Sequence, residues 1–205
     1  MSVPPPPTGR PITHVYDAAY AGVPNWDIGR PQRAFVDLLD AGLVRGPVLD
    51  VGCGTGELSL FLARNGHEVL GIDLSPMAVR QSRSKAAGRR IPARFLVLDA
   101  LDVSTLRSAG LSFRTVVDSA MLHVLGDRER DRFIDGLGDV LDSGGLYCVL
   151  GDVRRAERDI YGITPEELRE RFREAGGWEV AFAYRTGFER RWSTNAAYFV
   201  GVRRR

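Results

Sequence analysis

The stretch VLDVGCGTGE, residues 48–57, places a short apolar run directly before three glycines spaced two residues apart. A Val- and Leu-rich run that ends in glycines is typical of a buried strand that passes through a tight loop into a helix. Such loops often hold a phosphate group at the helix N-terminus. Here Asp50 precedes the loop and Glu57 follows it, and two carboxylates at that distance oppose a negatively charged ligand.

Strands and helices alternate along the chain on both sides of this loop. Runs rich in Val, Leu and Ile predict five buried parallel strands, PVLDVG, HEVLGID, ARFLVLD, FRTVVD and GLYCVLGD. Helical patterns predict helices over residues 13–21, 31–41, 57–65, 76–87 and 128–142, and a last one that begins with a capping box of Thr164 and Glu167 and runs to Ala175. The runs WEVAFAYR and NAAYFVGVR, joined by a loop alone, predict an antiparallel pair.

This order of elements predicts one α/β domain. The expected fold is a doubly wound, mostly parallel seven-stranded sheet, Rossmann-like, with an antiparallel strand near the C-terminus and helices from the N-terminal part laid over it as a lid. A chain of 205 residues is long enough to bury the core of one such domain. The four consecutive prolines near the N-terminus predict a disordered tail over residues 1–12.

The composition excludes several classes of protein. The 28 basic and 26 acidic side chains nearly balance, which gives no electrostatic argument for a nucleic-acid or membrane surface. No apolar run approaches the roughly 18 residues of a membrane span, and the N-terminus lacks the apolar stretch of a signal peptide. Cys53 and Cys148 form no CxxC pair, so we expect free thiols and a cytoplasmic protein. No cluster has metal-ligand spacing, so no metal is expected.

An aspartate stands at the end of each predicted parallel strand: Asp50, Asp73, Asp99, Asp118 and Asp152. In open α/β sheets, ligands bind beyond the carboxyl ends of the strands, so these side chains are expected to surround one site. Aspartate also commonly makes turns at strand ends, which is the alternative for each of them taken singly. The glycine spacing is GxGxG rather than the GxGxxG of dinucleotide sites. Together these features indicate a ligand with hydroxyl groups and positive charge.

In their order and spacing, VLDVGCGTGE, GIDLSP, VLDA and VVDSAMLHV resemble the successive motifs of class I S-adenosylmethionine-dependent methyltransferases. The upstream stretch PNWDIGRPQ resembles a small-molecule branch with thiopurine, thiol and halide, tellurite-resistance and benzoquinone methyltransferase-like members, although Val51 stands where several of them carry proline. The resemblance implies S-adenosylmethionine as methyl donor and S-adenosylhomocysteine as product. It also implies in-line transfer to an N, S or O nucleophile of a small aromatic or heteroaromatic molecule.

The resemblance further implies which residues contact the cofactor. They are Trp26, Asp50, Gly52, Cys53, Gly54, Gly56, Asp73, Leu74, Met77, Asp99, Ala100, Asp118 and Ser119. In this set Asp50 and the first two glycines are expected to hold the methionine end, and Asp73 the ribose hydroxyls. Leu74 and Met77 are expected to pack near the adenine, and Asp99 to accept from its amino group. Trp26 is expected to cover the bound cofactor, with ordinary aromatic packing as the alternative.

Four residues are candidates for the acceptor side of the site: Tyr16, Tyr20, Asp118 and His123. His123 is expected to act as a general base or as a hydrogen bonder to the acceptor, and the alternative is a loop histidine satisfied by its neighbours. Tyr16 and Tyr20 lie one helical turn apart, and core packing is an equal alternative for them. If the sixth strand runs parallel to the first five, the segment TGFERRWS, residues 186–193, emerges at the same edge as the aspartates.

The single domain is therefore expected to divide by role: lid helices over residues 13–46, a cofactor-binding core over 47–152, and a substrate-side helix with the closing strand pair over 153–205. Three rival functions stay open. A nucleic-acid methyltransferase would use the basic run from Arg80 to Arg90, which is otherwise a solvated helix face. A nicotinamide-dependent oxidoreductase and a cofactor-binding protein without transferase activity are the others. The acceptor and the oligomeric state are left open.

Overall fold

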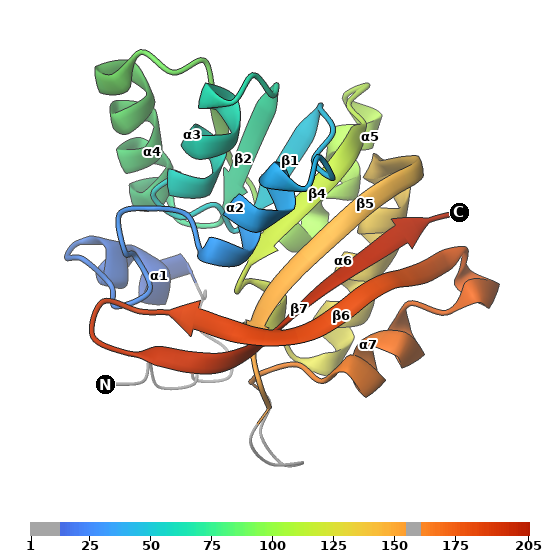
Figure 1. The fold of residues 1–205 in the computed structure, drawn as a ribbon. Coiled ribbons are helices and arrows are strands. Elements are labelled where there is room, and N and C mark those ends of the chain that lie inside the picture. Colours follow the sequence, from blue (N-terminus) through green and yellow to red (C-terminus); the bar gives the residue numbers. More distant parts are fainter. Residues whose placement is uncertain (1–12, 155–160) are drawn as a thin grey trace.

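A computed structural model of the chain describes residues 13–154 and 161–205 (Figure 1). The tail predicted over residues 1–12 lies outside the described residues. One seven-stranded sheet with the order β3-β2-β1-β4-β5-β7-β6 forms the centre of the molecule. Its strands are Val48–Val51 (β1), Val69–Asp73 (β2), Arg94–Val97 (β3), Phe113–Ser119 (β4), Leu141–Asp152 (β5), Trp178–Glu189 (β6) and Thr194–Arg204 (β7).

The strand directions confirm the predicted fold. The strands β1 to β5 run parallel to one another, while β7 is antiparallel to both β5 and β6. It follows that β6 runs in the same direction as β5. Within the sheet, β1 lies between β2 on one side and β4 on the other, so the strand order reverses at β1. In such sheets the crevice for a ligand lies at this reversal, beyond the carboxyl ends of the strands.

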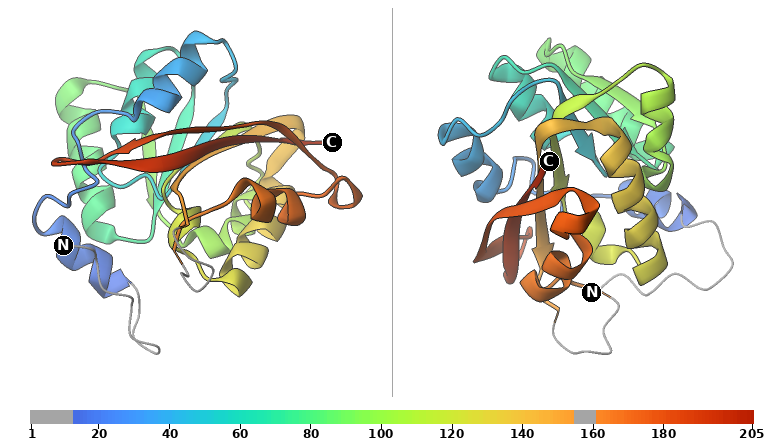
Figure 2. Two further views of the ribbon diagram at one scale, coloured as in Figure 1. Left: turned by 60° about the horizontal axis from the view of Figure 1, so that its bottom comes forward. Right: turned by 90° about the vertical axis from the view of Figure 1, so that its right-hand side faces the viewer.

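Helices cover both faces of the sheet (Figures 1 and 2). The α-helices are Thr13–Tyr20 (α1), Arg33–Asp40 (α2), Glu57–Arg64 (α3), Pro76–Arg89 (α4), Ser104–Ser108 (α5), Asp127–Val140 (α6) and Pro165–Arg171 (α7). Two apolar cores result, one on each face. The first packs α5, α6 and α7 against the sheet, and the second packs α2, α3 and α4 against the opposite face.

The local sequence explains most helix ends and also two wrong predictions. Ser75 caps α4 by accepting a hydrogen bond from Ala78 N at 3.1 Å, and Pro76 occupies the first turn. The helix continues past Gly88 to Arg89, because Arg90 takes the left-handed conformation that ends it. Thr164 caps α7 as predicted, but this helix ends at Arg171 and a short 3₁₀ turn follows. Three 3₁₀ turns and α5 were not predicted.

Glu167 does not complete the expected capping box, because its carboxylate is used elsewhere. It accepts hydrogen bonds from Arg130 at 2.5 Å, Arg154 at 2.7 Å and Arg171 at 2.9 Å. The fully buried Arg130 also donates to the carbonyls of Leu125, Gly162 and His123. This one guanidinium therefore ties α6 to the 3₁₀ turn Leu122–Val124 (η2) and to the segment that precedes α7.

In the part of the chain that the structure describes, no helix has the length and apolar character needed to cross a membrane.

Replacement of Arg130 by methionine is expected to lower the free energy of unfolding by about 3–5 kcal/mol. The change leaves three carbonyls, two of them in buried contacts, without this donor and removes one of the three guanidiniums that face Glu167. Urea unfolding followed by circular dichroism measures the loss. The matched control is Arg169→Met on the exposed side of α7, where a surface pair with Glu166 contributes at most about 1 kcal/mol. Equal stability of the two variants would contradict the role given to Arg130.

Candidate functional site

The glycine loop after β1 needs its glycines for close packing. Gly52, Gly54 and Gly56 all have positive φ values, of 65°, 55° and 86°. A Cβ at Gly52 would lie 2.8 Å from Met121 Cβ, and a Cβ at Gly54 would lie 2.8 Å from the hydroxyl of Tyr20. The loop therefore passes tightly between the turn after β4 and helix α1, in a conformation that other residues adopt only with strain.

Asp73, the last residue of β2, connects this loop to the start of α4. One carboxylate oxygen accepts a hydrogen bond from Gly54 N and the other from Ser75 N, each at 2.8 Å. Burial raises the pKa of Asp73, while these two backbone donors lower it and limit the shift. Each oxygen keeps a second lone pair, so the carboxylate can also accept from ligand hydroxyls beside the glycine loop.

Asp50 of β1 and Asp118 of β4 lie at the same edge of the sheet, and their side chains are buried in the protein interior. Asp50, only 1% exposed, accepts from Ser59 Oγ at 2.5 Å, and burial raises its pKa to about 7. Asp118 accepts from Met121 N at 2.7 Å, Leu122 N at 3.0 Å and Tyr147 Oη at 2.8 Å, and burial raises its pKa to about 6. Both carboxyls fix the loops that follow their strands. This arrangement gives no support to a direct contact of Asp118 with donor or acceptor.

Helix α1 and the loop after it lie over the glycine loop. Trp26 Nε1 donates to the Tyr20 hydroxyl at 3.2 Å, and the two rings meet edge to face with centroids 6.1 Å apart. Tyr20 in turn faces Gly54, so it lies against the glycine loop, and its predicted role on the acceptor side stays a prediction. Trp26 orients Tyr20, and its predicted contact with the cofactor stays a prediction.

Helix α1 and the loop after it, residues 13–32, are called the cover below. Two aspartates of the cover, Asp17 and Asp27, were not predicted to be site residues. Asp17 accepts from Ser75 Oγ and from Met77 N, which fastens α1 to the first turn of α4. Asp27 accepts from Thr55 Oγ1 at 2.7 Å and fastens the following loop to the glycine loop. Asp27 belongs to the stretch PNWDIGRPQ, whose resemblance to small-molecule methyltransferases is described above. No sequence pattern marks Asp17.

Tyr16 is a half-buried residue of α1. Burial raises its pKa to about 12, and the charges of Tyr161, Asp73 and Glu129 add to the shift. Asp73 ends β2 and Glu129 lies in the first turn of α6, so charges from two different elements act on this phenol. The phenol stays protonated at neutral pH and can donate a hydrogen bond.

His123 in η2 is held by the end of β5. Its Nδ1 accepts a hydrogen bond from Asp152 N at 2.9 Å, and its ring meets Phe188 edge to face at 6.1 Å between centroids. Burial lowers the pKa of His123 to about 4, although the charge of Asp152 acts in the opposite direction. The residue is neutral at physiological pH, and its ring lies next to the ends of β5 and β6, so its predicted place on the acceptor side stays a prediction.

The hairpin between β6 and β7 emerges at this same edge. Arg190 Nη2 donates to Asp152 Oδ2 at 2.6 Å, and Asn195 Nδ2 donates to the same oxygen at 3.2 Å. The hairpin is joined to the lid loop, because Arg191 N donates to the carbonyl of Asn25 at 2.8 Å. Phe188 is buried beside His123, whereas Trp192 is 84% exposed at the tip. Asp152 thus links the end of β5 to His123 through its backbone N–H and to the hairpin through its carboxylate.

The other predicted cofactor residues lie along the same edge. Asp99 caps the 3₁₀ turn Ala100–Asp102 through Leu101 N, and Cys53, Leu74 and Ser119 are half-buried beside the loops. Directly after Ser119, Ala120 has a φ of 76°, an unusual conformation for a non-glycine residue that marks the turn toward His123. Among the described residues, no group of three His, Cys, Asp or Glu side chains is placed to hold a metal ion.

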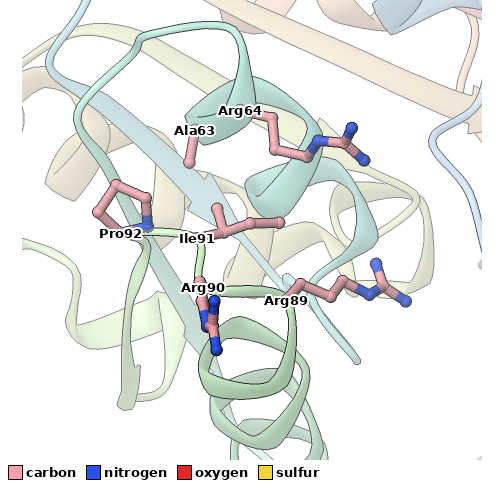
Figure 3. A pocket seen from close by; sticks show the side chains of 6 residues that line it. All are labelled: Ala63, Arg64, Arg89, Arg90, Ile91 and Pro92. Carbon is pink, nitrogen blue, oxygen red and sulfur yellow. The ribbon is translucent and has the colours of Figure 1, made fainter.

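The charges on the α3–α4 side are largely paired. Glu57 accepts from Lys85 and Arg89 and is only 12% exposed, so its charge is compensated instead of standing free at the helix N-terminus. Arg83 donates to the carbonyl of Phe95. The pocket drawn in Figure 3, lined by Arg64, Arg89, Arg90 and apolar neighbours, lies where α3 and α4 end, at the amino edge of the sheet and away from this site.

Comparisons with known proteins agree with this geometry. Residues 48–145 match the family model described as a methyltransferase domain. The chain is 32% identical over 154 residues to a 2-heptyl-1-hydroxyquinolin-4(1H)-one methyltransferase of Mycobacteroides abscessus, a match that covers 73% of this chain and 67% of that protein. A solved structure described as "Conversion of a Disulfide Bond into a Thioacetal Group during Echinomycin Biosynthesis" superimposes with a TM-score of 0.82 at 30% identity, over 95% of this chain and 92% of that one.

The magnesium protoporphyrin IX methyltransferase of Synechocystis PCC 6803, solved with bound S-adenosylmethionine, shares the fold. Its TM-score is 0.66 at 22% identity, over 84% of this chain and 77% of that one.

Asp50 is expected to make stability depend on pH. Its pKa of about 7 in the fold lies above the ordinary value of 3.8, so its stabilising contribution is present in acid and is lost as the pH rises through about 7. The Asp50→Asn variant lacks this loss. The free energy of unfolding of this variant, relative to that of the unsubstituted protein, should therefore rise by up to about 4 kcal/mol between about pH 4 and pH 8. Urea unfolding at both pH values measures the gain, with exposed Asp40→Asn as control. A difference that does not change with pH would contradict the assignment.

Proposed function

The chain belongs to the class I S-adenosylmethionine-dependent methyltransferases, and we propose that it methylates an N, S or O nucleophile of a small aromatic or heteroaromatic molecule. The enzyme class and the cofactor follow from the family. The acceptor class is the proposal, and it is supported by one feature above all: the chain's own cover over the site.

This cover is fixed on both sides. Asp17 and Asp27 fasten it to α4 and to the glycine loop, while Asn25 fastens it to the β6–β7 hairpin. Gln32 adds two hydrogen bonds to the backbone of Glu189, so the cover and the hairpin form one wall. An acceptor that has to fit entirely behind such a wall must be small. The wall therefore favours a small molecule over a polymer.

Three members of the basic run, which the rival nucleic-acid function would need, are engaged within the protein. Lys85 and Arg89 pair with Glu57, and Arg83 holds the carbonyl of Phe95. Phosphate contacts depend on free Lys and Arg side chains, so this face offers little for a nucleic acid. The name of the Mycobacteroides abscessus relative also favours a small heteroaromatic acceptor, an N-hydroxyquinolone.

The residues present fit the cofactor. Asp73 has free lone pairs for the ribose hydroxyls, because its two oxygens each accept one backbone hydrogen bond, from Gly54 N and Ser75 N. Leu74 and Met77 would border the adenine, and Asp99 would accept from its amino group. When bound, the cofactor supplies a methyl group on a sulfonium, an electrophile that needs no further activation.

The chain's own residues then hold the acceptor in line. The cover excludes water, and His123, Phe188 and Tyr16 border the acceptor side. Alignment of a nucleophile with an activated carbon can by itself lower a barrier by several kcal/mol. Positioning is therefore the main task of this site.

Calorimetry should detect binding of S-adenosylmethionine and S-adenosylhomocysteine and no binding of NAD. In Asp73→Asn an amide nitrogen must face one of the two backbone N–H groups and can no longer accept as the carboxylate does. We expect at least a tenfold rise in the dissociation constant, about 1.4 kcal/mol. The control Asp102→Asn changes an exposed aspartate near the same edge and should bind normally. Unchanged affinity of the Asp73 variant would show that the ribose lies elsewhere.

A screen for S-adenosylhomocysteine release tests the acceptor class. The panel contains aryl thiols, N-hydroxy heteroaromatics, heteroaromatic amines, quinols, total RNA and duplex DNA. Transfer to one or more small molecules and none to nucleic acid is expected. Transfer to nucleic acid alone, or to no member while the cofactor binds, would contradict the proposed function.

A further inference from the structure

The backbone of β5 fixes the hydrogen-bonding role of His123. Its Nδ1 accepts from Asp152 N, so the proton of the neutral ring is on Nε2. The donor is a main-chain N–H of a strand that pairs with β4 and β7, so the donor itself is held in place by the sheet. Nε2 therefore presents an N–H group, and the lone pair of Nδ1 is already used. A ring held this way donates a hydrogen bond and has no free site for an incoming proton.

The charges that face the ring come from three elements. They are Arg190 of the β6–β7 hairpin, Arg130 of α6 and Asp152 of β5. Burial disfavours a charged ring first, the two guanidiniums disfavour it further, and the Asp152 carboxylate alone favours it. That carboxylate is itself paired with Arg190 at 2.6 Å. The surroundings thus hold His123 neutral.

The other described acids and phenols that the sequence or the structure assigns to the site are engaged as well. Asp118 accepts three hydrogen bonds, and Asp73 accepts two backbone N–H groups. Glu129 accepts from Gly126 N at 2.8 Å with one oxygen. Tyr16 and Tyr20 are neutral, since burial raises the pKa of each. Glu129, whose charge reaches Tyr16, is the acid that an experiment must separate from His123.

We propose that His123 donates a hydrogen bond from Nε2 to the acceptor, and that the acceptor is a small molecule acidic enough to enter the site already ionised. Aryl thiols, N-hydroxy heteroaromatics and electron-poor phenols have this property. The inference rests on the proposed function and narrows its acceptor class. It makes His123 a residue that recognises an anionic or electron-rich atom, in place of a general base.

The chemical step then balances without proton transfer by the chain. The acceptor loses its proton to water before it binds. A lone pair of the anion forms the bond to the methyl carbon, the carbon–sulfur bond breaks, and its electron pair returns to sulfur. An anion and a sulfonium become a methylated acceptor and a neutral thioether. Opposite charges attract strongly where water is excluded, so the closed site favours the ionised acceptor.

Nitrogen NMR of histidine-labelled protein tests the role of His123 without any acceptor. The chain has three histidines, and the His123 signals are assigned by their loss in His123→Gln. We expect an Nε2–H tautomer that shows no protonation between about pH 5 and 8, with or without S-adenosylmethionine. A proton on Nδ1, or a titration near the ordinary value of about 6.5, would overturn the proposal.

Kinetics with matched acceptors test the substrate class. The probes are 4-nitrophenol against 4-methylphenol and thiophenol against phenol, which differ little in shape and much in acidity. The acidic member of a pair should have at least a tenfold higher kcat/KM near pH 7, with a pH midpoint that follows the acceptor. Similar rates within each pair, with one pH midpoint common to all acceptors, would overturn the proposal.

Two substitutions separate a donor from a base. His123→Gln keeps an N–H donor but cannot take up a proton, so a loss of less than about tenfold is expected, whereas His123→Phe should lose on the order of a hundredfold. Glu129→Gln should leave the pH midpoint where the acceptor sets it. Equal losses in the Gln and Phe variants would overturn the proposal. If no probe is methylated although the cofactor binds, the proposed function fails, and the NMR result still decides the role of His123.

Discussion

The hydrogen bond from Gly54 N to Asp73 is the constraint on which the rest of the site depends. It joins the glycine loop after β1 to the end of β2, while the other oxygen of Asp73 starts α4 through Ser75 N. Helix α1 then packs against both partners, with the Tyr20 hydroxyl over Gly54 and Asp17 on the first turn of α4. One carboxylate thus fixes the loop and the helix on which the cover packs, and it is the same carboxylate that we propose for the ribose.

The sequence predicts the fold well, because strand–helix alternation and turn residues are local signals. It also places the aspartates correctly at one edge of the sheet, but it cannot predict their directions. Asp50 and Asp118 turn inward because Ser59 and Tyr147 supply buried hydroxyl partners, and Tyr147 lies 29 residues away along the chain. The argument that Glu57 opposes a phosphate fails for the same reason, since Lys85 and Arg89 compensate its charge from a different helix. Asp73 is the acid that faces the loop.

Long-range partners also explain what sequence reasoning missed. The capping box of α7 is incomplete because the buried Arg130 draws the Glu167 carboxylate away. Asp152 looks like a turn residue in the sequence, yet the antiparallel β7 and the hairpin bring Arg190 and Asn195 to its side chain. Its backbone N–H in turn decides the tautomer of His123. A motif can name a histidine as catalytic, but the hydrogen bond from the strand behind it determines whether that histidine can accept a proton or can only donate a hydrogen bond.

The two sides of the site are held by one segment. Residues that contact the glycine loop, such as Asp27, stand next to Asn25, whose carbonyl holds the hairpin beside His123. Arg30 extends this link through its pair with Glu189 at 2.8 Å. If the methyl donor binds on the first side and the acceptor on the second, as proposed, the same short piece of backbone positions both. For a displacement whose electrophile is already activated, such alignment supplies what acid–base groups supply in other enzymes, which is why a neutral, donating histidine suits this site.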